Sequence, residues 1–193
     1  MISVGQRVQE AIDHMSRGDY VLALTPTCIA LDITSQRHFG SKRSNRNIYK
    51  RFIQEHLWLI TYMGFPGLMA TTIRIPFSHP DIKADAAGNI GVEDAIYHII
   101  RCSLVHSDEK SAKIVWNNAI SLGIDPTGNL ILNPQLIWGL LGAVVFSPAN
   151  KDESSSNQYW LSIADFKMFI SEAWGRIDIA KRVIKLHTGI SIP

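Results

Sequence analysis

The chain has 193 residues, a formal net charge of +2 and 46% hydrophobic residues. This length indicates one domain, and this composition is typical of a globular protein that buries a core. The small positive charge excludes binding to nucleic acid through global charge alone, so a basic surface must come from local clustering. The two cysteines, Cys28 and Cys102, lie far apart in the sequence, which favours reduced thiols over a secreted disulfide scaffold.

No targeting or membrane segment is expected. The N-terminal residues are mixed polar and lack the apolar stretch of a signal peptide. The longest apolar run, 136–146, is too short to span a bilayer and predicts a buried helix. We therefore expect a cytoplasmic protein without a membrane partner.

The first third of the chain predicts three helices. Val4 to Met15 carries apolar residues at helical spacing. Tyr20 to Ile33 is mostly apolar and predicts a more buried helix, in which Pro26 produces a kink or a late start. Asn45 to Met63 predicts the third helix, after a loop at 38–45.

A basic stretch runs from Arg37 to Arg51, with no acidic residue between Asp32 and Glu55. Clustered Lys and Arg give affinity for a nucleic-acid backbone whatever its sequence. The alternative interpretation is a solvated entrance to the third helix. The candidate phosphate-contacting residues are Arg43, Arg46 and Lys50.

Two further segments predict irregular or β structure. Residues 64–91 contain three prolines that prevent a long helix, and Thr71 to Phe77 predicts a short extended piece. Residues 111–134 predict short strands, and Asp125-Pro126-Thr127-Gly128 suits a type I turn between two of them.

The last third predicts mostly helix. An apolar helix is expected at 134–147, a polar and flexible loop at 148–158, an amphipathic helix at 160–174 and a final helix at 177–187. The sum is a mainly α protein, a single helical domain over 1–193 with irregular or β insertions near 64–91 and 111–134.

The stretch from Val92 to Glu109 has the strongest functional pattern. It predicts an amphipathic helix to about Val105, followed by a polar exit, and it places His106 five positions after Arg101. This spacing alone decides little, because the chain contains it four times. The other pairs are Arg51/His56, Arg74/His79 and Arg182/His187.

Only the pair at 101 and 106 combines a rigid, strongly patterned helix with a nearby helix end. Five α-helical residues turn through about 500°, so side chains at this spacing converge only where the helix ends or bends, or across a dimer interface. The pair at 51 and 56 is expected inside a continuous helix, the pair at 74 and 79 on a loop, and the pair at 182 and 187 at a fraying end.

Arg101-Cys102-Ser103-Leu104-Val105-His106, after an apolar helix, resembles the Arg-x4-His signature of HEPN domains. These are all-α domains of prokaryotic toxin–antitoxin and phage-defence systems. The resemblance implies a HEPN-like helical bundle and a homodimeric, metal-independent endoribonuclease. It also implies RNA as the substrate, an antitoxin or nucleotidyltransferase as a partner, and no cofactor.

The resemblance further implies roles for single residues. Arg101 would hold the scissile phosphate, and His106 would act as general base or acid. Tyr97 and Cys102 flank the arginine and are candidate substrate contacts. The family commonly has a polar residue where this chain has Cys102, and the family's subset with a Tyr two positions after the His is not matched, since Asp108 stands there.

Other interpretations of the same residues stay open. Arg101 could pair with Asp94 in a purely structural role, and the HEPN-like module could bind or assemble without catalysis. The basic stretch could bind RNA without cleaving it. His98, Cys102 and His106 share a helical spacing that could hold a soft metal, but we expect no metal site because no fourth ligand is evident.

Overall fold

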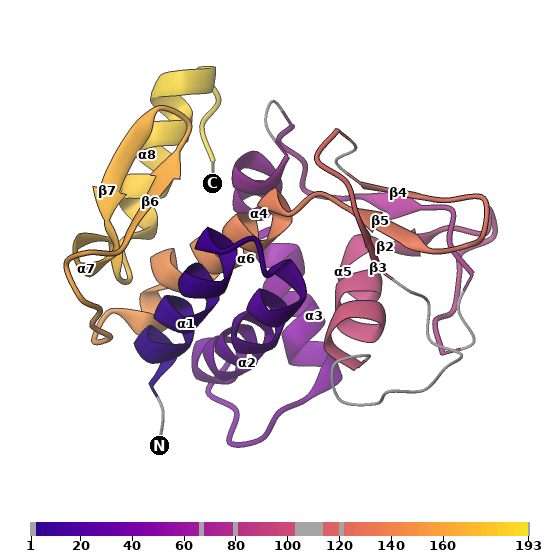
Figure 1. Ribbon diagram of the computed structural model, residues 1–193, viewed down its shortest axis with the longest axis horizontal. Helices are drawn as coiled ribbons and strands as arrows, with labels where there is room; N and C mark the ends of the chain where they lie inside the picture. The colour runs from indigo at the N-terminus through magenta and orange to yellow at the C-terminus, as the bar shows by residue number, and fades with distance from the viewer. Residues whose placement is uncertain (1–2, 66–67, 79–80, 103–113, 120–121, 193) are drawn as a thin grey trace.

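A computed structural model describes residues 3–65, 68–78, 81–102, 114–119 and 122–192, and helices dominate it (Figure 1). The predicted mainly α class is confirmed. None of the helices in these described ranges has the length and apolarity that crossing a membrane requires. The helices are α1 (Val4–Ser16), α2 (Tyr20–His38), α3 (Arg46–Glu55), α4 (Leu57–Gly64), α5 (Val92–Ala95), the π-helix η1 (Ile96–Cys102), α6 (Gln135–Phe146), the 3-10 helix η2 (Pro148–Asn150), α7 (Ile170–Ala173) and α8 (Ile177–Thr188).

The strands form three small sheets. They are β1 (Arg74–Ile75), β2 (Ile90–Gly91), β3 (Ile114–Trp116), β4 (Leu122–Ile124), β5 (Leu130–Leu132), β6 (Trp160–Ile163) and β7 (Phe166–Phe169). β1 pairs antiparallel with β2, β6 pairs antiparallel with β7, and the third sheet has the order β3-β5-β4. Strands therefore occur in both segments where irregular or β structure was predicted.

The core centres on α6, which packs against α2 and closely against α4. Almost every side chain of α6 is buried, as its apolar run predicted. Glycines allow the close approach to α4. A Cβ atom on Gly139 would lie 2.2 Å from the carbonyl oxygen of Ile60, and one on Gly142 would lie 2.3 Å from the sulfur of Met63. Backbone contact at this seam is possible only without side chains there.

Residues 45–63 form two helices, α3 and α4, rather than the single helix predicted. The break falls at His56, whose side chain is 6% exposed. Its Nδ1 lies 2.9 Å from the carbonyl oxygen of Phe52, so this nitrogen donates a hydrogen bond and the ring is held against α3. Burial is the main reason that the pKa of His56 falls to about 4, and the ring is neutral at pH 7.

The turn predicted at residues 125–128 is confirmed and joins β4 to β5. One carboxylate oxygen of Asp125 accepts hydrogen bonds from the backbone N–H groups of Thr127 and Asn129, each at 2.8 Å. These bonds, the one from Asn129 first, lower the pKa of Asp125 to about 2. The parallel pairing of β3 with β5 was not predicted.

Residues 160–169 form a β-hairpin, so the amphipathic helix predicted over 160–174 is wrong except for the short α7. Strand β6 alternates exposed and buried side chains, with Leu161 and Ile163 inward. Ala164 lies in the turn with a φ of 49°, and it is the one non-glycine residue of the described chain with a positive φ. Figure 1 shows the hairpin beside α8, away from α5 and the sheet of β3, β4 and β5.

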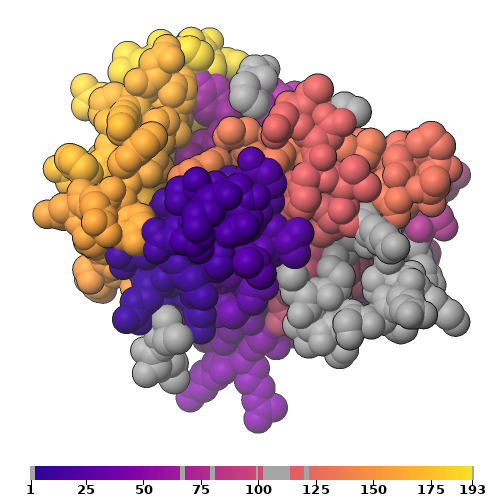
Figure 2. All heavy atoms as spheres, viewed as in Figure 1, coloured from indigo at the N-terminus to yellow at the C-terminus, as the bar shows by residue number. Residues whose placement is uncertain are grey.

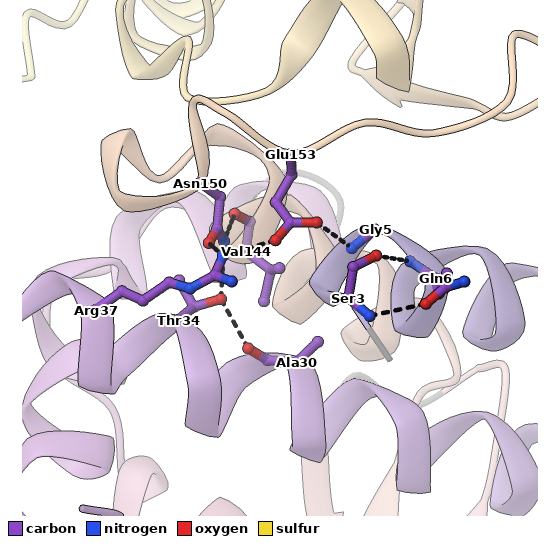
Figure 3. Close-up of polar contacts among 9 residues, drawn as sticks. All are labelled: Ser3, Gly5, Gln6, Ala30, Thr34, Arg37, Val144, Asn150 and Glu153. Atoms are coloured by element: carbon purple, nitrogen blue, oxygen red, sulfur yellow. Dashed lines mark hydrogen bonds and ion pairs between the residues drawn. The ribbon is translucent and has the colours of Figure 1, made fainter. Parts of the chain in front are cut away.

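The segment 148–158 is tied to the helices and is not the flexible loop that was predicted (Figure 3). Glu153 accepts a hydrogen bond from the backbone N–H of Gly5 at 2.8 Å and pairs with Arg37 at 2.7 Å. Asn150 is buried and donates to the hydroxyl of Thr34 at 2.8 Å. A carboxylate at the first turn of α1 satisfies N–H groups that have no partner within the helix.

Candidate functional site

The predicted helix at 92–105 is a single turn of α-helix, α5, followed by the π-helix η1 to Cys102. A π-helix bonds each N–H to the carbonyl five residues earlier, and such segments are rare and frequent at functional sites. This wider helix carries both Tyr97 and Arg101. The prediction of helical structure is confirmed over the described residues, and its α-helical type is wrong beyond Ala95.

The guanidinium of Arg101 contacts α2 and the loop before α3. Its Nη2 donates to the hydroxyl oxygen of Ser44 at 3.0 Å and lies 3.5 Å from a carboxylate oxygen of Asp32. Its Nη1 lies 3.4 Å from the hydroxyl of Tyr97. The side chain is 25% exposed, so solvent and a ligand can reach one side of it.

Two aromatic rings flank the same guanidinium. Its central carbon lies 5.1 Å from the ring centroid of Tyr97 and 5.6 Å from that of Tyr49. The two rings meet edge to face at 5.5 Å. Cation–π attraction from two sides limits the rotamers that Arg101 can adopt, so the charge is held in one place.

Tyr49 is fully buried and serves as an orienting ring. Burial and then the neighbouring Cys28 raise its pKa well above the usual value, so it remains a neutral phenol. Tyr97 is half-buried, and part of its ring faces solvent. Of the two rings, only Tyr97 can therefore meet a ligand.

Asp32 and Ser44 complete the polar contacts of Arg101. The Ser44 hydroxyl donates to the second carboxylate oxygen of Asp32 at 2.7 Å, while the first faces Arg101. Asp32 is only 18% exposed. Sequence reasoning did not identify these two residues, because they lie far from Arg101 in the chain and no motif marks them.

Arg46 and Lys50 reach the same face from α3 and meet at Asp94. Lys50 Nζ lies 2.6 Å and Arg46 Nη2 3.7 Å from one carboxylate oxygen of Asp94. The guanidinium carbon of Arg46 lies 5.9 Å from the ring centroid of Tyr97. Asp94 was considered as a structural partner of Arg101. It pairs with Lys50 and Arg46 instead, and Arg101 pairs with Asp32.

We call this cluster the Arg101 face. It comprises Asp32, Ser44, Arg46, Lys50, Asp94, Tyr97 and Arg101. Arg43 lies next to it on the exposed loop before α3. Four of the predicted site residues thereby lie on one face: Arg46, Lys50, Tyr97 and Arg101. The two arginines lie over the half-exposed Tyr97 ring, and Lys50 joins them through Asp94.

Cys102 is the last residue of η1, and His106 lies outside the described residues, as does His79. The histidine of the pair at 51 and 56 is buried, so it cannot exchange protons with a ligand in solution. The pair at 182 and 187 lies on α8, and both residues line one cavity. Within the described ranges no group of three or more His, Cys, Asp or Glu side chains is placed to hold a metal ion.

That cavity lies between α8 and the β6–β7 hairpin and has a volume of about 660 Å³. It was not predicted, because residues 160–174 were interpreted as a helix. Figure 2 shows the segments that form it gathered on one side of the molecule, opposite the segments of β4 and β5. Alternation of apolar residues at Leu161 and Ile163 was the available signal for a strand there.

Comparison with known proteins identifies the family. The chain belongs to the Rv1289 family, whose model matches residues 3–192. It is 27% identical over 190 residues to uncharacterized protein Rv1289 of Mycobacterium tuberculosis and, to the same degree, to uncharacterized protein Mb1320 of Mycobacterium bovis. The match covers 96% of this chain and 89% of each relative. No solved structure matches the chain.

Proposed function

We propose that the Arg101 face binds single-stranded RNA and that Arg101 and His106 cleave it as a HEPN-type, metal-independent endoribonuclease. The observation that carries the proposal is the placement of Arg101. Its guanidinium is held by two aromatic rings, a hydroxyl and a carboxylate, and one quarter of the side chain remains exposed. A fixed, partly exposed guanidinium is suited to a phosphate whose charge grows during reaction.

The residues around Arg101 fit an extended nucleic acid strand. Arg43, Arg46 and Lys50 lie beside it and can contact flanking phosphates. The exposed part of the Tyr97 ring offers a surface on which a base can stack. Stacking favours unpaired bases, and we therefore propose single-stranded rather than double-stranded RNA.

The proposed reaction is an internal transesterification. The 2′-oxygen attacks the adjacent phosphorus, the bond from phosphorus to the 5′-oxygen breaks, and the products are a 2′,3′-cyclic phosphate and a 5′-hydroxyl. One His106 removes the proton of the 2′-hydroxyl, and the His106 of a second copy protonates the leaving 5′-oxygen. Arg101 stabilises the negative charge on the non-bridging oxygens.

This proposal carries three biological expectations from the HEPN resemblance. The chain acts as a homodimer, it works in the cytoplasm as a toxin or phage-defence effector, and an antitoxin or nucleotidyltransferase restrains it. Each rests on the same resemblance as the proposed activity.

The test is cleavage of single-stranded RNA by purified protein in EDTA. We expect wild-type protein to cut, and His106→Ala to cut at least about 100-fold more slowly while keeping its unfolding temperature. The matched control is His187→Ala, because His187 stands at the same spacing from an arginine. The proposal is contradicted if His106→Ala cleaves RNA as fast as wild type, or if EDTA abolishes cleavage by the wild-type protein.

A second candidate function is RNA binding without cleavage, and one contact favours it. Asp32 offsets the charge of Arg101 at 3.5 Å, which weakens the stabilisation that Arg101 can give to the negative charge that develops during cleavage, while Arg43, Arg46 and Lys50 remain to contact phosphates. On this account protein and RNA associate in a salt-sensitive manner, while wild type and His106→Ala leave the RNA intact to the same extent. Detection of a 2′,3′-cyclic phosphate product that requires His106 decides against this candidate.

A further inference from the structure

The cavity between α8 and the β6–β7 hairpin has a wall of apolar side chains and a charged rim. Helix α8 has two apolar faces. Ala180 and Ile184 are fully buried against the rest of the protein, whereas a second row faces the cavity. The cavity's apolar lining consists of Ile163, Phe166, Met168, Ile179, Val183 and Leu186.

Part of this apolar lining is exposed to solvent. Leu186 is 79% exposed and Phe166 is 49% exposed. Large apolar side chains that gather around a concave surface, rather than scatter singly, mark a binding surface. The volume of about 660 Å³ falls within the range of small-molecule sites, roughly 300–1,000 Å³.

The charges around the cavity favour an anion beside Arg182. Arg176 is neutralised by Asp178, which it meets at 3.0 and 3.1 Å. Arg182 lines the cavity from the middle of α8, between Arg176 and His187. Within the described part of the chain, no carboxylate lies at ion-pair distance from Arg182, so its charge is available to a ligand.

The wall of the cavity at the hairpin turn is polar and carries a negative charge. His187, Ala164 and Asp165 line both this cavity and a neighbouring one of about 780 Å³. The Tyr62 hydroxyl and His187 Nδ1 share a hydrogen bond. Burial, and then the charge of Asp165, raise the pKa of Tyr62, so the phenol stays protonated and adds no second negative charge. Asp165 disfavours an anion beside the turn, which leaves Arg182 as the contact for the anionic group of a ligand.

The hairpin turn that carries Asp165 is strained. Ala164 adopts a left-handed conformation, which glycine or asparagine adopts more readily at such turns. Strain of this kind persists where the surrounding structure requires it and clusters at ligand sites. Its position on the shared wall of both cavities agrees with a binding role for the hairpin.

We infer that the cavity between α8 and the β6–β7 hairpin binds an amphipathic anion, an unbranched aliphatic chain with a carboxylate or phosphate head group at Arg182. Aliphatic side chains make up most of the apolar wall, and burying an aliphatic chain against them removes apolar surface from water. This site is separate from the Arg101 face and does not depend on the proposed ribonuclease activity.

The test is calorimetric titration of the full-length protein with decanoate, decyl phosphate, decanol and decyltrimethylammonium. We expect the two anions to bind more tightly than the alcohol, and the cation to bind most weakly. The ratio between decanoate and decyl phosphate identifies the preferred head group. Failure of both anions to bind below about 1 mM, or equal binding of the cation, overturns the inference.

Two exposed positions separate the head-group and chain contacts without threatening the fold. Arg182→Ala should weaken both anions about tenfold or more and leave decanol unchanged. Leu186→Asp should weaken both anions and decanol. Matched controls are Arg17→Ala and Leu22→Asp, which alter exposed residues outside α8 and the hairpin. Unchanged anion binding in Arg182→Ala contradicts the assignment of the head group to Arg182. If the wild-type protein is a dimer and Leu186→Asp makes it a monomer, a second copy of the chain fills the cavity and the inference is wrong.

Discussion

The Arg101 face and the cavity beside α8 use arginine in opposite ways. Arg101 is surrounded by polar and aromatic partners, with Asp32 offsetting its charge. Arg182 stands at the rim of an apolar wall, with no carboxylate at ion-pair distance among the described residues. The first arrangement fixes a charge for a polyanion, and the second attracts an anion that also buries an apolar chain. The same spacing to a histidine therefore says little about function until the surroundings are known.

The largest effect on stability is expected at the contact between α4 and α6, in the core that lies between the two regions. Gly139→Ala places a methyl group against the carbonyl oxygen of Ile60, at 2.2 Å, and neither backbone can yield easily. We expect a loss of about 3 kcal/mol in the free energy of unfolding, measured by urea denaturation. Ala143→Gly, on the same helix, is the control and should lose only about 1 kcal/mol from helix propensity, apart from its lost methyl contacts. A tolerated Gly139→Ala would mean that the seam is looser than described.

His56 joins α3, on the Arg101 side, to α4, on the cavity side, and should make stability depend on pH. Its folded pKa of about 4 lies below the ordinary value of 6.5, so the unfolded chain binds the proton more readily. Stability should be constant above about pH 7 and should fall by up to about 3 kcal/mol as the pH drops from 6.5 to 4.

His56→Gln isolates this contribution. The variant should lose the part of the pH dependence that lies between pH 6.5 and 4, when unfolding free energies are compared at each pH. Other groups, such as Asp125 with a pKa of about 2, titrate lower and remain in both proteins. Identical pH profiles for wild type and variant would contradict the burial of a neutral His56.

Glu153 should matter near neutral pH and lose its influence in acid. Burial alone would raise its pKa, but the N–H of Gly5 and the guanidinium of Arg37 outweigh this and lower it. Its contribution is therefore present above the ordinary pKa of a glutamate and disappears as the pH falls through the lowered value. Glu153→Gln should cost about 1–2 kcal/mol at pH 7.

The control for this prediction is Glu10→Gln, which removes a more exposed carboxylate that pairs with Arg7 within α1. That change should alter stability by less than about 0.5 kcal/mol. If both variants unfolded at the same denaturant concentration, the contacts of Glu153 that attach the 148–158 segment to α1 would contribute nothing to the free energy of unfolding.

The smallest effect, on RNA affinity and cleavage rate, is expected at Asp32. It shows whether Asp32 positions the Arg101 guanidinium or only neutralises its charge. Asp32→Asn removes a negative charge beside Arg101, so affinity for single-stranded RNA should rise modestly. Because the guanidinium is then held less firmly, cleavage should slow. Asp178→Asn, next to Arg176, is the control and should change neither. A rate of cleavage that rises in Asp32→Asn would show that Asp32 only inhibits.

Where the sequence had one strong local pattern, it was a sufficient guide to the fold. The spacing of Val4 and Val8 predicted α1, and the apolar run at 136–146 predicted α6. The hairpin at 160–169 was misassigned because Ile163, Phe166 and Phe169 recur every three residues, a spacing that fits one face of a helix. What decides in favour of the strands is a turn at Ala164, a residue that gives no sign of a left-handed conformation.

The Arg101 face was predictable only in part, for a related reason. Tyr97 and Arg101 share one helix, and Arg46 and Lys50 share another, so local patterns point to each pair. Asp32 comes from α2 and contacts Arg101 only because the helices pack together. The π-helical geometry of η1 was also not predictable, because the spacing of apolar residues over seven positions does not distinguish a π-helix from an α-helix.

The most direct test of the central claim is the equilibrium affinity for single-stranded RNA of Arg101→Ala beside Arg182→Ala, across a series of salt concentrations. We predict that Arg101→Ala binds about tenfold or more weakly with a shallower salt dependence, and that Arg182→Ala binds as wild type does. Wild-type affinity in Arg101→Ala, or an equal loss in both variants, would contradict the assignment of the Arg101 face as the RNA-binding site.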